Sequence, residues 1–588
     1  MTIPTGAIVA YFSMEICLEQ AIPTYSGGLG VLAGDTLRAA ADLEVPMIAV
    51  TLLDRKGYFT QTLDPSGQQH EAEVTWSPEK VLAPERARAS VEIGGRRVEI
   101  RAWRYDVRGA NGHVVPVFLL DTNLPENTEW DRTLTDCLYG GDSHYRLCQE
   151  VVLGMGGAAM LEAMGYADDA LYHMNEGHAA LITLTLLERE LAGRARNDIS
   201  EAVLERVRKR CIFTTHTPVP AGHDKFDEGE FRSVLGDARA QLLFDAHVID
   251  GTTLNMTHLA LRLSRYVNAV AMRHREISQG MFPDYPIDSI TNGVHATTWT
   301  AAPFQALFDR RIPEWRRDNQ YLRYAIDIPL EEILDAHAEA KAALFAEVHA
   351  RTGVKLDPAV MTIGFARRAT PYKRADLIFS DINRLKAIAE RSGKIQLLFG
   401  GKAHPRDEGG KSLIKQIYAA AASLPSSVHV VYVENYEMDI AHLMTAGVDL
   451  WLNNPTKPLE ASGTSGMKAA LNGVPSYSVL DGWWVEGCID GVTGWSIGDA
   501  KSDEGEEIAD LYVKLERVIL PLFYGLPFSW AKVMRNAIAL NGSFFNTQRM
   551  VGQYVHNAYF PPKDQRPIPV AAAENAKEEV HTAWAGLQ

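Results

Sequence analysis

The sequence predicts an α/β protein made of two doubly wound, Rossmann-like domains that face each other across a cleft. One reason is length, because 588 residues are more than a single hydrophobic core usually organises. A second reason is that short apolar runs rich in β-branched residues alternate with segments of helical periodicity. This alternation, typical of a parallel sheet covered by helices, occurs in both halves of the chain.

The second half shows the alternation most clearly. Apolar residues at helical spacing predict helices at 373–391 and 407–423. Because helical connections join parallel strands, one parallel sheet is expected. Its strands are predicted at 361–368, 395–401, 428–435, 448–454 and 475–482.

The first half repeats the theme less regularly. Its predicted strands are 7–13, 46–53 and 211–217, with a β-rich excursion at 90–121. Its predicted helices are 31–43, 146–164, 178–192 and 265–277.

The domain boundary is expected near 291–300, where Gly293 and small polar residues interrupt the pattern. This gives an N-terminal domain at 1–295 and a C-terminal domain at 296–540. We expect residues 541–588 to cross back to the N-terminal domain and to end, from about residue 560, in a surface tail. Two open α/β sheets of this kind bind ligands beyond the carboxyl ends of their strands, so the motifs should cluster there.

Composition narrows the function classes. With 46% hydrophobic and 22% charged residues, the chain resembles a soluble globular protein. A net charge of −16 disfavours nucleic acid or an anionic membrane as partner. The five cysteines are scattered without a CxxC pair, which favours a reduced compartment and no metal site. A secretory signal and a membrane-spanning run are not found, so a cytoplasmic protein is expected.

A cationic segment begins at the end of the predicted strand at 361–368 and continues into the loop after it. It contains Arg367, Arg368, Lys373 and Arg374 within GFARRATPYKR. Several cations where a doubly wound sheet opens its cleft suit oxyanions such as phosphate. The alternative is a solvated basic face, which is the usual meaning of a charge run.

Two further loops are candidates for substrate contacts. Gly28 and Leu29, in SGGLG before a helical run, would allow close backbone approach and offer N–H groups to an anion, although a plain turn is equally compatible. His216, in the loop THTPVPAGHD (215–224) that follows the strand residues CIFT, could contact a substrate or serve structurally, and its spacing to His223 is no standard zinc pattern. Asn268, polar among apolar residues, could bind a backbone group or a sugar hydroxyl.

The stretch EASGTSGMK, 460–468, lies between a predicted strand and a helical run. Thr464 and Ser465 stand at the helix start, where hydroxyl and N–H groups can hold a phosphate. Lys468 follows about one turn later, and apolar neighbours could lower its pKa enough for Schiff-base chemistry. The alternative is an ordinary capped helix with a snorkelling lysine.

Taken together, these motifs resemble the α-glucan phosphorylases, the family of glycogen and starch phosphorylase, and most closely its short bacterial type. EASGTSGMKAALNGVP resembles the family's pyridoxal-phosphate attachment segment. The resemblance spans roughly residues 8–540, and the other matches follow in the expected order: SGGLGVLAGD, NMTHLALRLSRYVNAVAMRH, TNGVHATTW, GFARRATPYKR and VENYEMD.

The resemblance implies a glycosyltransferase-B type architecture and a role for each matched residue. Lys468 would carry pyridoxal phosphate as a Schiff base, with Tyr436 near the ring. The cofactor's phosphate would be held by Thr464, Ser465 and Arg367. The substrate phosphate would meet Arg368, Lys373 and Gly28, next to Leu29. The glucosyl unit would be held by Asn268, His216, Glu460, Ser462 and Gly463.

The implied reaction is the reversible cleavage of a terminal α-1,4-glucosidic bond by inorganic phosphate, giving α-glucose 1-phosphate with retention. A phosphate whose second pKa is about 6 exchanges protons near neutrality, so no carboxylate pair is required. The family further suggests a homodimer. Larger members have His and Glu in place of Thr370 and Pro371, and Arg in place of Glu437. Because the first strand is predicted near residue 7, without their N-terminal regulatory extension, we expect neither a phosphorylation switch nor nucleotide activation.

Three alternatives remain at this stage. A nucleotide-sugar glucosyltransferase would share the cleft but would have no use for a cofactor on Lys468. A glucan-binding protein without turnover would need neither Lys468 nor the cationic loop. An aminotransferase-type enzyme would lose activity on reduction of its Schiff base, whereas a phosphorylase would keep it.

Overall fold

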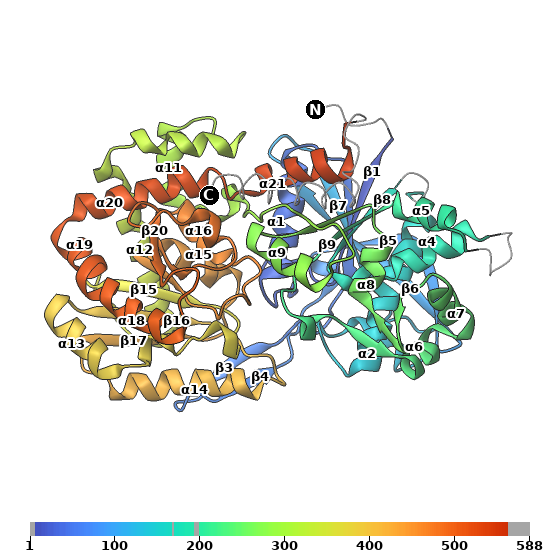
Figure 1. The fold of residues 1–588 in the computed structure, drawn as a ribbon, viewed down its shortest axis with the longest axis horizontal. Coiled ribbons are helices and arrows are strands. Elements are labelled where there is room, and N and C mark those ends of the chain that lie inside the picture. Colours follow the sequence, from blue (N-terminus) through green and yellow to red (C-terminus); the bar gives the residue numbers. More distant parts are fainter. Residues whose placement is uncertain (1–5, 167–169, 193–198, 563–588) are drawn as a thin grey trace, which may run out of the picture.

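The computed structural model describes residues 6–166, 170–192 and 199–562, and most of the tail expected from about residue 560 lies outside them. Figure 1 shows two groups of elements side by side, one around a nine-stranded sheet and the other around a six-stranded sheet. The prediction of an α/β protein with parallel sheets is confirmed. Among the described residues, none of the helices combines the length and apolar character that a membrane span requires.

The larger sheet belongs to the first half of the chain. Its strands are parallel from β14 to β7, and β6 and β5 continue it in antiparallel pairing. In spatial order they are β14 (Asp288–Ser289), β13 (Tyr266–Ala269), β9 (Cys211–Thr214), β8 (Ala170–Asn175), β1 (Ile8–Ser13), β2 (Met47–Leu52), β7 (Val114–Asp121), β6 (Arg96–Arg108) and β5 (Ala83–Ile93).

Both faces of this sheet are buried. Along β1, Ala10 and Phe12 belong to one apolar cluster, and Val9 and Tyr11 belong to a second cluster. Successive side chains of a strand point to opposite faces, so the two clusters lie on the two sides of the sheet. Because both faces are buried, the sequence of β1 is continuously apolar and does not alternate between apolar and polar residues.

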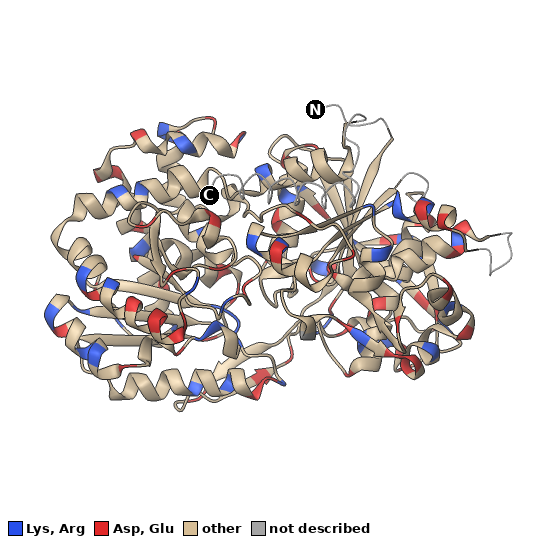
Figure 2. Cartoon of the chain, in the orientation of Figure 1, with Lys and Arg blue, Asp and Glu red and all other residues tan. Residues whose placement is uncertain are grey.

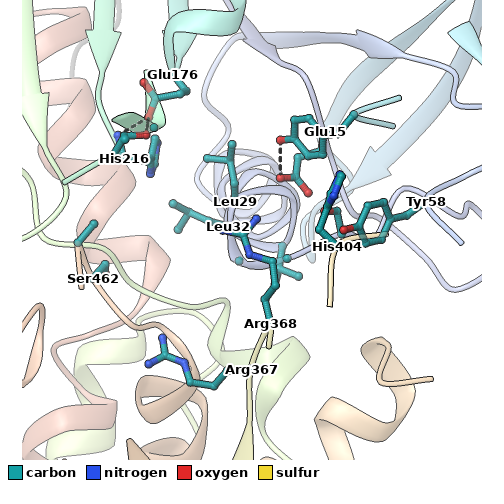
Figure 3. A pocket seen from close by; sticks show the side chains of 18 of the residues that line it. Glu15, Leu29, Leu32, Tyr58, Glu176, His216, Arg367, Arg368, His404 and Ser462 are labelled. Atoms are coloured by element: carbon teal, nitrogen blue, oxygen red, sulfur yellow. Dashed lines mark hydrogen bonds between the residues drawn. The ribbon is translucent and has the colours of Figure 1, made fainter. Parts of the chain in front are cut away.

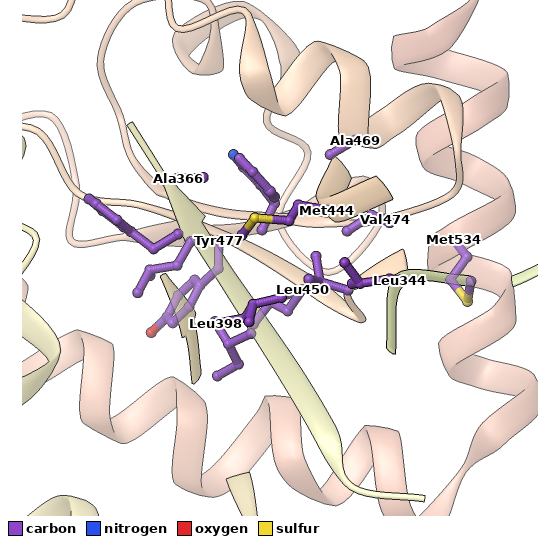
Figure 4. Close-up of a cluster of buried hydrophobic side chains, with 14 of the residues drawn as sticks. Leu344, Ala366, Leu398, Met444, Leu450, Ala469, Val474, Tyr477 and Met534 are labelled. Atoms are coloured by element: carbon purple, nitrogen blue, oxygen red, sulfur yellow. The ribbon is translucent and has the colours of Figure 1, made fainter. Parts of the chain in front are cut away.

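The smaller sheet is entirely parallel. Numbered along the chain from β15, its order is 3-2-1-4-5-6, so the winding direction reverses between β15 and β18. Leu398, Leu450 and Tyr477, on three of its strands, share one buried cluster with helix residues such as Leu344 (Figure 4). The strands are β17 (Val428–Val433), β16 (Ile395–Gly400), β15 (Met361–Ala366), β18 (Leu450–Asn453), β19 (Ser476–Val479) and β20 (Gly494–Ile497).

The helices surround these sheets, and we name them in two parts of the chain, the first up to residue 299 and the second from residue 302 onward. Those of the first part are α1 (Gly28–Asp42), α2 (Ser143–Val151), α3 (Gly157–Ala163), α4 (Ile182–Glu190), α5 (Glu201–Arg208), α6 (Glu228–Leu235), α7 (Asp237–Asp245), α8 (Met256–Arg262), α9 (Met272–Met281) and α10 (Ala296–Trp299). Those of the second part are α11 (Ala302–Arg311), α12 (Leu330–Thr352), α13 (Ile382–Ser392), α14 (Glu408–Ser423), α15 (Met438–Gly447), α16 (Ser465–Leu471), α17 (Trp484–Gly487), α18 (Glu504–Lys514), α19 (Leu520–Gly525), α20 (Pro527–Asn536) and α21 (Thr547–Gln553).

Short helical turns complete the chain. The 3-10 turns are η1 (Pro78–Lys80), η2 (Asp131–Thr135), η4 (Gly177–Ala179), η5 (Pro220–Gly222), η6 (Asn319–Asp327), η7 (Pro371–Lys373) and η8 (Leu377–Phe379). The π-helical turns are η3 (Val152–Gly156), η9 (Leu515–Ile519), η10 (Ala537–Gly542) and η11 (Tyr554–Tyr559).

Two of the predicted helices differ from the structure. The segment 265–277 begins with β13, which pairs with β9 and β14, and becomes helical only at α9. A short, fully buried strand has no alternation, so its apolar residues mimic a helical stripe. In 373–391, the α-helix starts at Ile382, because the preceding residues form the turns η7 and η8.

Two segments connect the elements around the two sheets. A hairpin of β3 (Thr60–Leu63) and β4 (Gln69–Ala72) reaches the loops after β16 and β17, where the Gln61 side chain donates to the Gly401 carbonyl at 3.0 Å (Figure 1). Near the C-terminal end, Met550 of α21 packs in the same cluster as Leu37 of α1. A further small sheet contains β10 (Lys225–Asp227), β12 (Thr253–Asn255) and β11 (Ile249–Asp250).

Candidate functional site

A cavity of about 710 Å³ opens at the carboxyl ends of strands from both sheets (Figure 3). Each strand delivers its side chains through the loop that follows it, as expected for parallel α/β sheets. Lining residues after the strands of the larger sheet are Glu15, Glu176 and His216. Those after the strands of the smaller sheet are Arg367, Arg368, Lys373, Lys402, Tyr436, Glu460 and Lys468.

The structure brings together nearly all the side chains that the sequence singled out. The predicted residues that line the cavity are Gly28, Leu29, His216, Arg367, Arg368, Lys373, Tyr436, Glu460, Ser462, Gly463, Thr464, Ser465 and Lys468. Figure 2 shows how acidic and basic residues are distributed over the part of the chain that the structure describes, and the net charge of the full sequence is −16. The cations of this cavity are therefore a local feature that the overall charge does not reveal.

Glu460 is the partner of two of these cations. Its Oε2 atom lies 2.5 Å from Nζ of Lys373 and 2.6 Å from an Nη atom of Arg367. Burial alone would raise the pKa of Glu460, but the charges of Arg367 and Lys373 outweigh it and hold this pKa at about 2. The carboxylate is therefore ionised at neutral pH and holds both cations at one edge of the cavity.

Arg368 differs from its neighbours because it remains exposed. Within the described residues, its guanidinium has neither a hydrogen bond nor an ion pair. A guanidinium in a cavity with unused donors suits an oxyanion that arrives from solution.

Lys402 is a cation that the sequence reasoning missed. Its Nζ donates to the Phe59 carbonyl at 2.8 Å and to Glu437 at 3.0 Å, and burial lowers its pKa. The available signal was its position directly after Gly401 at the end of β16, the same strand-end rule that identified Arg367. Glu437 therefore compensates a positive charge next to the cavity.

Lys468 lies on α16 with its ammonium in an apolar setting. Its Nζ is 3.7 Å from the centre of the Trp299 indole ring, which stacks on His442. Burial lowers the pKa of Lys468 to about 8, although Asp35 and Cys17 oppose the shift. A larger fraction of the amine is consequently neutral near pH 7, as a nucleophile for a carbonyl group requires.

The glycine loop at the start of α1 leaves room for a ligand. A Cβ atom built on Gly28 would meet nothing within 4 Å. Deeper in the helix, a Cβ on Gly34 would come within 1.9 Å of the Cys17 carbonyl oxygen. Gly34 therefore serves close packing, whereas Gly28 gives the cavity access to the backbone.

His216 is held by the strand end beside it. Its Nε2 lies 2.6 Å from Oδ1 of Asn175, and its backbone N–H donates to Glu176 at 2.7 Å (Figure 3). Burial lowers the pKa of His216 well below its ordinary value, and other histidines add to this effect. The imidazole is therefore neutral at pH 7 and suited to hydrogen bonding. Sequence reasoning missed Glu176 because its strand, β8, was not predicted.

Two expected site residues lie elsewhere. Asn268 does not line the cavity, because its side chain is engaged with Thr214, the Ala269 carbonyl and Tyr554. This difference follows from its place on the buried strand β13 instead of on a helix. Arg374 also turns away, toward Glu507 at 2.6 Å and the carbonyl of Asn454.

The arrangement could hold a phosphorylated aldehyde. Lys468 offers an amine, and Arg367 and Thr464 line the same cavity. The Ser462 hydroxyl is buried and has no hydrogen-bond partner within the described residues. An unpartnered buried hydroxyl beside cations is a feature that a polar ligand would satisfy.

Comparisons with known proteins identify the family and relatives of the chain. Residues 236–490 match the family described as carbohydrate phosphorylase. The chain is 40% identical to the maltodextrin phosphorylase of Thermococcus litoralis, over 94% of this chain and 70% of that protein. It is 38% identical to the glycogen phosphorylase of Mycobacterium tuberculosis, over 95% of this chain and 71% of that protein. It is 36% identical to the glycogen phosphorylase of Aquifex aeolicus, over 94% of this chain and 86% of that protein.

Proposed function

The chain belongs to the carbohydrate phosphorylase family, and on this premise we propose that it is an α-1,4-glucan phosphorylase. It transfers terminal glucosyl units of maltodextrin or glycogen to inorganic phosphate, gives α-glucose 1-phosphate with retention, and catalyses the reverse reaction. The observation that carries the proposal is that Arg367, Arg368, Lys373 and Lys402 line the same cavity as Lys468. A cavity for a neutral glucan alone would need neither this charge nor a lysine of lowered pKa.

We also propose that the chain forms two doubly wound, Rossmann-like domains of the glycosyltransferase-B type, at 1–295 and 296–540, with the C-terminal segment crossing back over its described residues 541–562. The 3-2-1-4-5-6 strand order of the smaller sheet supports the second domain. The hydrogen bond between Tyr554 and Thr214 supports the crossing.

The proposed cofactor is pyridoxal 5′-phosphate on Lys468. Arg367, Thr464 and Ser465 would hold its phosphate, and Tyr436 would lie near its ring. When bound, it supplies a phosphate whose second pKa is about 6 and which can exchange a proton with the substrate phosphate. The lowered pKa of Lys468 and the cations that line the same cavity fit such a group.

The substrate phosphate would be bound by Arg368, Lys373 and the backbone at Gly28 and Leu29. In phosphorolysis, the bond between C1 of the terminal glucosyl unit and the leaving glucan oxygen breaks. A proton of the substrate phosphate passes to that oxygen, and a phosphate oxygen forms the new bond to C1. The cations stabilise the negative charge of two neighbouring phosphates, which would otherwise repel each other.

The glucosyl unit would be held by His216, Glu460, Ser462 and Gly463. His216 is neutral and fixed by Asn175, so its imidazole can orient a sugar hydroxyl without adding charge. Glu460 is ionised and can accept a hydrogen bond from a hydroxyl. We assign Asn268 a supporting role behind this site.

The proposed setting is the cytoplasm, with a homodimer as the assembly and no nucleic-acid partner.

Mixing the purified enzyme with maltodextrin and phosphate should release glucose 1-phosphate, and no glucose 1-phosphate should form if phosphate is omitted. Borohydride reduction of the cofactor linkage separates this function from an aminotransferase-type reaction. The reduced phosphorylase should keep its activity, since the phosphate and not the imine takes part. A preparation that carries the cofactor but yields no glucose 1-phosphate would contradict the proposal.

A further inference from the structure

A second hollow, of about 560 Å³, lies beside the catalytic cavity. We call it the Trp130 shelf, and it is lined by Arg96, Thr128, Trp130, Gly141, Asp142, His144 and Tyr145. Asp142 also lines the catalytic cavity, together with its neighbours Gly140 and Ser143. The two hollows therefore meet at the loop 140–143. The volume of the Trp130 shelf lies in the range of roughly 300–1,000 Å³ that is usual for small-ligand sites.

The shelf presents aromatic surface to solvent. Trp130 is 39% exposed, and its ring centre lies 5.7 Å from that of His144 and 6.1 Å from that of Tyr145. The backbone of Trp130 is anchored, because it precedes η2 and its carbonyl accepts hydrogen bonds from both the N–H and the hydroxyl of Thr133. Tryptophan and tyrosine combine a large apolar ring with a polar group, which is why they are enriched at binding surfaces.

Hydrogen-bonding groups around Trp130 remain unused. The indole N–H of Trp130 has no hydrogen-bond partner among the residues that the structure describes. Asp142 uses Oδ1 to cap α2, accepting from Tyr145 N at 2.9 Å, whereas its Oδ2 accepts no hydrogen bond within the described part of the chain. The shelf therefore offers a donor and an acceptor next to an aromatic ring, over which the Arg96 guanidinium lies 5.6 Å from the ring centre.

The charges of the shelf argue against an anion as its ligand. Arg96 is neutralised by Asp131, with two hydrogen bonds of 2.9 and 3.1 Å. The carboxylate of Asp142 adds a negative charge. A ligand suited to this shelf is uncharged, rich in hydroxyls and apolar on one face, which is the chemistry of a pyranose ring.

We propose that the Trp130 shelf binds glucosyl units of the glucan chain that extends from the catalytic cavity. This inference rests on the proposed phosphorylase function. With the non-reducing end at His216 and Glu460, the chain leaves past the loop 140–143. One ring stacks on Trp130 and binds Asp142 through a hydroxyl, a hydroxyl of the neighbouring ring accepts from the indole N–H, and longer glucans gain affinity that shorter ones lack.

The test uses the holoenzyme and a series of maltooligosaccharides from maltotriose to maltoheptaose. In Trp130→Ala, we expect KM for maltoheptaose to rise three- to tenfold, while kcat and KM for phosphate stay within twofold of the wild-type values. The effect should shrink as the oligosaccharide shortens. His144→Ala should weaken the same length dependence and serves as a second variant should Trp130→Ala fold poorly. Phe528→Ala, an exposed aromatic on α20 away from both hollows, is the matched control.

A second readout is independent of turnover. Titrating the enzyme with maltoheptaose in phosphate-free buffer should change the tryptophan fluorescence of the wild type and of Phe528→Ala, and this change should be reduced in Trp130→Phe. The proposed glucan binding at the shelf would be overturned if KM depended on oligosaccharide length in both shelf variants as in the wild type and the fluorescence response of Trp130→Phe were also unchanged. If the wild type released no glucose 1-phosphate from any glucan, the proposed function would fail instead, and the titration alone would decide whether the shelf binds glucan.

Discussion

Nζ of Lys373 lies 2.5 Å from Oε2 of Glu460, although the two residues are 87 positions apart in the chain. The same carboxylate oxygen also contacts Arg367 at 2.6 Å. One anion thus compensates two cations from the loop after β15, and Arg368 keeps its charge available to a ligand. The proposed binding of phosphate in this cavity depends on this uneven pairing.

Glu460→Gln should make the protein less stable in a pH-dependent way. The folded-state pKa of Glu460 is about 2, below the ordinary value of 4.5, so its ionised form stabilises the fold above about pH 4.5. That contribution is lost as the pH falls toward 2. We expect the melting temperature of the variant to be lower by roughly 5 °C at pH 7, since two buried cations lose their partner.

Melting curves recorded from pH 7 to pH 3 would check this. The difference between wild type and variant should narrow on acidification. Glu408→Gln, whose side chain is 82% exposed, should show no such difference. If the melting temperatures of the wild type and Glu460→Gln differed by the same amount at every pH, this result would argue against the charge pairing of Glu460.

Arg368→Ala should impair the use of phosphate more than the use of glucan. A lost charge-assisted hydrogen bond costs about 1.5–3 kcal/mol, which corresponds to a rise in KM for phosphate of roughly ten- to a hundredfold. Arg368→Lys should recover part of the loss, and Arg391→Ala, with a 64% exposed side chain, should behave like the wild type. Initial rates at varied phosphate and fixed maltodextrin measure the effect. A change confined to KM for maltodextrin would speak against the assigned role.

The cofactor should join the apoenzyme at a rate that depends on pH. Burial lowers the pKa of Lys468 to about 8. As the pH rises toward this value, the fraction of Lys468 in the neutral amine form increases about tenfold per pH unit, and above it the fraction levels off. Absorbance changes after mixing apoenzyme with pyridoxal phosphate would follow this. Lys468→Ala should bind the cofactor without a covalent link, so borohydride treatment should leave no pyridoxyl adduct in its mass spectrum. Lys501→Ala, a surface variant, should keep the adduct, and an adduct on Lys468→Ala would refute the assignment.

Tyr554→Phe should destabilise the packing of the C-terminal segment without changing substrate binding. The phenol accepts from Asn268 Nδ2 at 3.0 Å and lies 3.1 Å from the Thr214 hydroxyl. Its loss leaves buried polar groups short of a partner, which lowers the free energy of unfolding by about 1–3 kcal/mol. Urea unfolding should register this while both KM values stay within twofold. Tyr324→Phe, at a 53% exposed position, is the control, and equal stability of both variants would count against the contact.

Part of the site was predictable because it follows a local rule. In a parallel sheet, ligand-binding side chains come directly after strands, and glycine or a cation at that position is visible in the chain. Arg367 and Arg368 were found in this way, and Lys402 obeys the same rule, whereas Lys468 was found from the segment EASGTSGMK at the start of a helix. The strands β8 and β13 were missed, and Glu176 with them, because short buried strands have no period that separates them from helices.

By itself, the sequence determined the α/β class, most strands of the smaller sheet, and the motifs that carry the cavity's charge. Those features depend on neighbouring residues, whose spacing is fixed by the backbone. Only the tertiary structure decided which charge meets which partner. Asn268 turned out to bind Tyr554, 286 positions away, and Arg374 turned toward Glu507 instead of the cavity. Such contacts depend on the order of strands in a sheet and on where each loop returns, and no local pattern records either.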